Sequence, residues 1–189
     1  MIADPQPGAA SAKWKNARVS QLAITVVGHD RPGIIARAAD ILAASGMNLE
    51  DSSMTLLRGH FAMTLICAGE SSTSEIESAM QQLDDESLDV TVREVPVEAD
   101  QPSLGLPYLV TVHGADRLGI VARLASVIAG AGGNITDLST RLVGDLYVLI
   151  AEVDLPTDVN VDALRSDIAR VAAELGVDAS LRPVERDDL

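Results

Sequence analysis

One short motif of ionisable and glycine residues, Gly-x-Asp-Arg-x-Gly-Ile, occurs twice in the chain. Asp30 in the first copy corresponds to Asp116 in the second. In both copies an alternating apolar segment precedes the motif and a helix-like segment follows it. The first amides of such a helix have no partner within the helix, and the helix dipole places partial positive charge there. Gly33 and Gly119 lack a β-carbon and would let another group approach closely. This end of each helix could therefore hold a carboxylate or another anion.

The same residues also have structural interpretations. Asp30 and Asp116 suit the N-cap of the following helix, and the two motif glycines could serve strand-to-helix packing. A second repeated polar residue, Asn48 in the first copy and Asn134 in the second, could be a turn former ahead of a strand. Duplication does not decide between these interpretations, because an ancestral packing motif would also be copied.

The elements that must position these residues follow one order in both copies. Alternating apolar residues predict a strand, and apolar residues at helical spacing then predict a helix that ends before Gly46 or Gly132. A hairpin follows, with turns predicted at 58–59 and 144–145. A second helix, opened in the first copy by the capping-box pattern Ser72-x-x-Glu75, leads to a last strand. The order βαββαβ predicts an α+β fold of two tandem ferredoxin-like domains, with antiparallel sheets and helices on one face.

The repeat also sets the predicted domain boundaries. A length of 189 residues suits two small domains. We place the first domain at 18–95 and the second at 108–185, joined by a proline-rich, polar linker at 96–107. Residues 1–17 show no periodicity and are predicted to form a mobile N-terminal arm, and residues 186–189 form an acidic tail.

Composition excludes several functions. A formal net charge of −14 repels phosphate backbones, and aromatic residues at 2% leave little for a base to stack on, so direct nucleic-acid binding is not expected. The single cysteine, Cys67, excludes an internal disulfide or a cysteine-cluster zinc site. His29, His60 and His113 do not recur at matching positions, so we expect no duplicated metal site and no cofactor. No apolar run approaches the length that spans a bilayer, so we expect a soluble, cytoplasmic protein without a membrane partner.

The order βαββαβ, the early Asp-Arg-x-Gly-Ile, and a Gly-x-Asn or Gly-Gly-Asn that leads into Leu-x-Asp or Ile-x-Asp closely resemble the ACT domain family. The tandem arrangement resembles its glycine cleavage system transcriptional repressor group. In that family amino acids bind at interfaces between ACT modules. The resemblance implies that the aspartate meets an ammonium group, the loop amides a carboxylate, and the asparagine both. The ligand-binding residues it implies are Asp30, Gly33, Ile34 and Asn48, with Asp116, Gly119, Ile120 and Asn134 in the second copy.

The second copy departs from the first where Leu118 replaces Pro32 and Ala115 replaces His29, so we expect unequal affinities at the two sites. Our main hypothesis is a non-catalytic regulatory protein that forms a homo-oligomer, expected to be a homodimer, binds an amino acid and transmits occupancy to a regulated protein partner. An alternative is a ligand-free protein–protein interaction module with the same fold. An enzyme is not expected, because the copies share no nucleophile with a base and no metal-ligand set.

Overall fold

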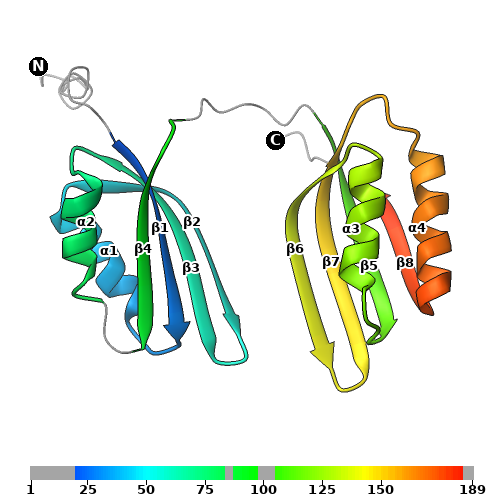
Figure 1. Ribbon diagram of the computed structural model, residues 1–189, viewed down its shortest axis with the longest axis horizontal. Coiled ribbons are helices and arrows are strands. Elements are labelled where there is room, and N and C mark those ends of the chain that lie inside the picture. The colour runs from blue at the N-terminus through cyan, green and yellow to red at the C-terminus, as the bar shows by residue number, and fades with distance from the viewer. Residues whose placement is uncertain (1–19, 84–86, 98–104, 185–189) are drawn as a thin grey trace, which may run out of the picture. The chain divides into compact units, whose positions relative to one another are not determined.

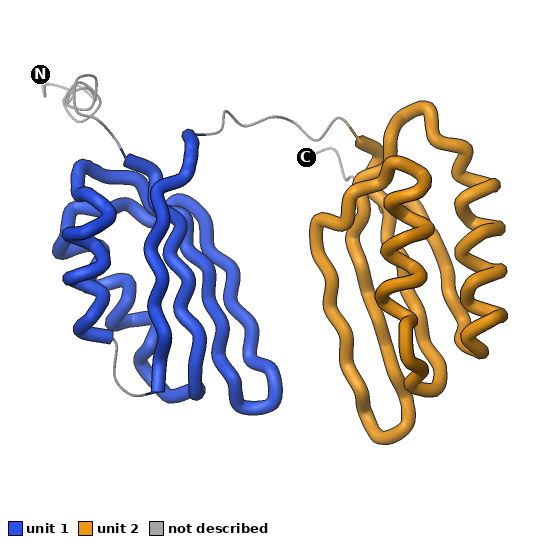
Figure 2. The backbone as a smooth tube through the Cα atoms, in the orientation of Figure 1, with its two compact units in different colours: residues 1–99 blue, residues 100–189 orange. Residues whose placement is uncertain are grey.

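The computed structural model describes residues 20–83, 87–97 and 105–184, which form two compact units that divide between residues 99 and 100 (Figure 2). The predicted N-terminal arm and acidic tail lie outside the described residues. So do residues 98–104 of the predicted linker.

Both units have the order βαββαβ, which confirms the predicted fold (Figure 1). The strands of each sheet pair antiparallel, in the orders β2-β3-β1-β4 and β6-β7-β5-β8. The two helices of each unit cover one face of its sheet. The first unit comprises β1 (Ser20–His29), α1 (Ile34–Ala44), β2 (Met47–Leu57), β3 (His60–Gly69), α2 (Thr73–Met80) and β4 (Leu88–Val95). The second comprises β5 (Leu106–Ala115), α3 (Ile120–Gly130), β6 (Asn134–Val143), β7 (Leu146–Leu155), α4 (Val161–Leu175) and β8 (Val177–Pro183). Strand β5 thus begins inside the segment predicted as linker.

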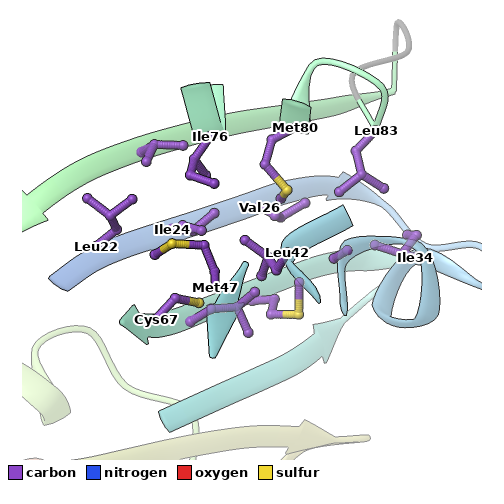
Figure 3. Close-up of a cluster of buried hydrophobic side chains, with 14 of the residues drawn as sticks. Leu22, Ile24, Val26, Ile34, Leu42, Met47, Cys67, Ile76, Met80 and Leu83 are labelled. Atoms are coloured by element: carbon purple, nitrogen blue, oxygen red, sulfur yellow. The ribbon is translucent and has the colours of Figure 1, made fainter. Parts of the chain in front are cut away.

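The core of each unit lies between the sheet and its two helices. Figure 3 shows the core of the first unit. Alternation on β1 turns Leu22, Ile24 and Val26 toward the helices, and all three are fully buried. Helix α1 meets them with buried residues that repeat every four positions, namely Ile34, Ala38 and Leu42. Full burial of a leucine or isoleucine side chain contributes about 1.5–3 kcal/mol. These contacts fix α1, and with it the loop that precedes α1.

One residue departs from the predicted helix face. Ile35 belongs to the apolar set of the first helix, yet it is 49% exposed. It follows the buried Ile34 directly, and successive helical residues point about 100° apart. Ile35 therefore lies beside the buried stripe and leaves apolar surface near the start of α1.

The predicted capping box of α2 and the predicted hairpin turn are confirmed in the first unit. The Ser72 side chain accepts a hydrogen bond from the N–H of Glu75, and the Glu75 carboxylate accepts one from the N–H of Ser72 at 2.8 Å. The β2–β3 hairpin turns at Arg58 and Gly59, with φ values of 51° and 84°. Two left-handed residues match the right-handed twist of the paired strands.

Within the described residues, no helix combines the length and the apolar character that a membrane crossing needs.

Each sheet has an edge strand with exposed apolar side chains. Strand β2 pairs only with β3, and β6 pairs only with β7. The exposed side chains are Leu49, Met54, Leu56 and Leu57 on β2, and Leu138, Leu142 and Val143 on β6. The backbone groups on the outer side of such a strand can pair with another strand.

Candidate functional site

The repeated motif forms the loop between β1 and α1, and again between β5 and α3. Glycine is the N-cap of both helices, with φ 92° and ψ 0° at Gly33 and φ 90° and ψ 5° at Gly119. The prediction that Asp30 and Asp116 are N-caps is therefore wrong. Each aspartate stands three residues before the cap, because the chain closes onto the helix through the left-handed glycine. Neither helix has a side-chain cap.

The motif glycines are required by backbone conformation and not by packing. A β-carbon built on Gly33 or Gly119 would meet no protein atom within 4 Å. Close packing is instead found at Gly28, where a β-carbon would lie 1.9 Å from the carbonyl oxygen of Ser87. A positive φ near 90° strongly favours glycine. Open space therefore adjoins both motif glycines, and the strand-to-helix packing interpretation does not apply to them.

The helices that follow the motif differ from the other two helices in their first turns. Helix α2 is capped by Ser72, and helix α4 by Asn160, whose side chain accepts a hydrogen bond from the N–H of Ala163 at 3.0 Å. Helices α1 and α3 have no side-chain cap and no acidic residue in the first turn. Their first N–H groups, with the positive end of the helix dipole, favour an anion.

In the second unit the motif loop borders a shallow surface pocket of about 370 Å³, within the general range for small-molecule sites of about 300–1,000 Å³. Its walls are residues 116–122 and Tyr147, so it is lined by Asp116, Gly119 and Ile120, but not by Asn134, the fourth residue proposed for this unit. Tyr147 was not predicted. It lies on β7 directly opposite Gly114 of β5, and strand pairing alone brings it to the loop.

Tyr147 also distinguishes the two units. The residue at the same register position in the first unit is Phe61, which pairs with Gly28 and is 2% exposed. Tyr147 is only partly buried and carries a hydroxyl group that can donate or accept a hydrogen bond. The second unit therefore has a hydroxyl group at the register position where the first unit has the phenyl ring of Phe61.

The predicted asparagines lie far from the aspartates of their own units. Asn48 pairs with Ala68, which pairs with Gln21 near the start of β1, whereas Asp30 follows the end of β1. The eight steps from Gln21 to His29 span about 26 Å at 3.3 Å per residue. Asn134 stands equally far from Asp116, because its partner Asp154 pairs with Pro107. No single unit brings the asparagine and the motif loop together.

Repeated arginines join the two helices of each unit. The Arg37 guanidinium donates to the carbonyl oxygen of Gln82 at 2.6 Å, just beyond α2. Its counterpart Arg123 pairs with Glu174 of α4. Hydrogen bonds from Arg123 and then Arg170 hold the pKa of Glu174 below its usual value. These contacts support the helix that carries the motif loop.

Within the part of the chain that the structure describes, the motif loops contain neither a metal site of three or more protein ligands nor a reactive thiol. Among the described residues, no group of three or more histidine, cysteine or acidic side chains could hold a metal ion. Cys67 is buried, and burial, followed by the charge of Glu50, raises its pKa to about 11. A thiol with so high a pKa is a poor nucleophile at neutral pH.

The fold agrees with the result of comparison with known proteins. The ACT domain family model matches residues 20–93 and again residues 107–182. The chain therefore belongs to the ACT domain family, with two copies in tandem.

Among relatives, a UPF0237 protein of Methanopyrus kandleri is 46% identical over 71 residues, covering 37% of this chain and 79% of that protein. A solved structure of an unknown protein from Galdieria sulphuraria has a TM-score of 0.74 at 26% identity, and the match covers 88% of this chain and 99% of the other. The chain also resembles a candidate glycine cleavage system transcriptional repressor, with a TM-score of 0.67 at 20% identity over 90% of this chain and 100% of the other. That last likeness concerns the fold alone. Membership in the ACT family supports a regulatory, ligand-binding role.

Proposed function

We propose that this protein is a non-catalytic regulator that binds an amino acid at interfaces between ACT modules and transmits occupancy to a protein partner, in transcriptional or metabolic control. The observation that carries the proposal is the repeated motif loop, where an uncapped helix start and a left-handed glycine border open space. The helix amides would receive the ligand carboxylate, and Asp30 or Asp116 would receive its ammonium group. Ile34 and Ile120, which open the two helices and are buried, would hold the first turn in place.

The distance between loop and asparagine indicates how a complete site would form. The motif loop lies at the sheet end where β2 finishes, since Leu57 pairs with His60 and His60 pairs with His29. Asn48 lies at the opposite end, where β2 begins. Antiparallel pairing of two edge strands would place the asparagine of one module at the loop end of another. A ligand held by both would then bridge two modules, of the same chain or of two chains.

The exposed apolar side chains of β2 and β6 support such pairing, and with it the expected homodimer. Strand pairing would satisfy the outer backbone groups and bury leucine and methionine side chains. A ligand that bridges modules would favour the paired state, and only such a difference in affinity between two states can transmit occupancy. The same edges also support the alternative, an interaction module that pairs without a ligand.

A thermal-shift screen of the common amino acids at millimolar concentration tests the proposal. A ligand at about a hundredfold its dissociation constant adds ~2.7 kcal/mol of stability, which moves the midpoint by several degrees. We expect one or two amino acids to shift the wild-type midpoint, and Asp30→Ala or Asp116→Ala to reduce the shift. Asp40→Ala is the matched control, because Asp40 is an exposed aspartate in the body of α1.

Two results would contradict the proposal. The absence of a shift for every amino acid, with dimerisation intact, would support the ligand-free interaction module. A ligand shift that Asp30→Ala, Asp116→Ala and Asp40→Ala all leave unchanged would place the binding site away from the motif loops.

A further inference from the structure

The first unit brings two of the chain's three histidines together at one end of its sheet. His29 ends β1 and His60 begins β3, and the two residues are direct partners in the antiparallel register. Their ring centroids lie 5.1 Å apart, with 29° between the ring planes. Both residues are exposed. Because Val26 and Phe61 face the core, alternation places both histidines on the face of the sheet away from the helices.

We propose that His29 and His60 together chelate a divalent transition-metal ion of the zinc, nickel or copper type. Zinc binds histidine nitrogen at about 2.0–2.1 Å in tetrahedral geometry, which sets the centroids of two ligating rings about 5 Å apart. The observed centroid spacing of 5.1 Å matches this distance, but the rings lie stacked, with 29° between their planes. Both imidazoles are exposed and can rotate about their side-chain torsions to direct a nitrogen at the ion. Imidazole suits zinc, copper and nickel, whereas magnesium and calcium prefer oxygen ligands. Solvent completes the coordination of an ion held by two protein ligands.

The backbone around the pair is already fixed by hydrogen bonds. The N–H of His29 donates to the carbonyl oxygen of Ser87 at 3.0 Å. The N–H of Asp30 donates to the carbonyl oxygen of Gly59 at 3.1 Å, which ties the motif loop to the hairpin turn before His60. Little backbone order is lost when an ion binds to strands held in this way, and such preorganisation favours binding.

The remaining histidine and the single cysteine offer little competition for the same ion. The third histidine, His113, stands on β5 with Asp178 at 3.6 Å. Cys67 is buried, with a raised pKa, and so does not supply the thiolate that binds metals. The register positions that correspond to His29 and His60 in the second unit hold Ala115 and Leu146. The second unit is therefore an internal comparison that has the same backbone and no histidine pair.

Calorimetric titration of the untagged, chelator-treated full-length protein with Zn²⁺ tests the site. We expect one ion per chain at the highest-affinity site. Losing one of two linked ligands removes the chelate effect, so His29→Ala and His60→Ala should each weaken binding by about tenfold or more. His113→Ala is the control and should leave the affinity unchanged. Wild-type affinity in both His29→Ala and His60→Ala would overturn the proposal, as would loss of binding in His113→Ala alone.

A second test introduces a zinc site into the second unit, so it does not depend on the loss of zinc binding in a variant. The double variant Ala115→His/Leu146→His places a histidine pair at the matching register of the second unit. Both positions are exposed, so the fold should persist, as far-UV circular dichroism would verify. We expect two Zn²⁺ ions per chain, and Cu²⁺ electron paramagnetic resonance should show two nitrogen ligands in the wild type. A double variant that still binds one ion would contradict the geometric argument. No amino acid enters these tests, so their outcome is independent of the proposed regulatory function.

Discussion

Replacing Gly119 by alanine separates the conformational role of the motif glycine from its place beside a ligand. At φ 90° an L-residue is strained, and no neighbouring atom within 4 Å of the added β-carbon contributes a clash. A left-handed conformation costs an L-residue about 1–2 kcal/mol. For a unit of this size that cost lowers the thermal midpoint by roughly 4–16 °C. The added methyl group would also stand in the open space where we place the ligand, and should weaken amino-acid binding by about tenfold, ~1.4 kcal/mol.

Gly176→Ala is the matched control. Gly176 ends α4 with φ 70°, and a β-carbon there would also meet nothing within 4 Å. Both variants should therefore lose similar stability in thermal unfolding, and only Gly119→Ala should lose affinity in calorimetric titration with the amino acid found by screening. Equal affinities in the two variants would refute the placement of the ligand beside Gly119. An unchanged midpoint for Gly119→Ala would refute the conformational argument.

Three further predictions concern the framework of the units. Ser72→Ala removes the capping box of α2, so urea unfolding should show a loss of about 0.5–2 kcal/mol, and no loss would contradict the cap. Arg123 holds the pKa of Glu174 low, so the wild type gains stability from this ionised carboxylate above its unfolded-state pKa and loses that gain as pH falls. Stability measured against pH should thus fall less on the acid side in Glu174→Gln, and curves of identical shape would argue against the pairing. Cys67, with its pKa raised to about 11, should react with a disulfide reagent at pH 8 only after urea unfolds the chain; rapid reaction in buffer would show that the thiol is accessible.

The order of elements was predictable because the pattern appears twice. Each copy independently switches from alternating to helical spacing, and the turn at Arg58-Gly59 stands where a hairpin needs left-handed residues. Burial at Ile34, Ala38 and Leu42 followed from the same spacing. Local chemistry and periodicity therefore determine the elements and most of the buried faces.

The arrangement of the candidate site was less predictable because it depends on contacts between elements. Aspartate is a residue type that suits a cap, but Asp30 stands three residues before Gly33, and closure of the turn through Gly33 assigns the cap to the glycine. Tyr147 reaches the second loop only through its pairing with Gly114. The separation of Asn48 from Asp30 follows from the antiparallel order of the sheet, which spacing along the chain does not reveal.

The most direct test of the central claim is a ¹H–¹⁵N NMR titration of the labelled protein with the amino acid found by screening. We predict that the backbone amides of Gly33, Ile34, Gly119 and Ile120 shift most, at one loop or both, together with the side-chain amides of Asn48 or Asn134. Shifts confined to the starts of α2 and α4, or to strands remote from the motif loops, would contradict binding at the uncapped starts of α1 and α3.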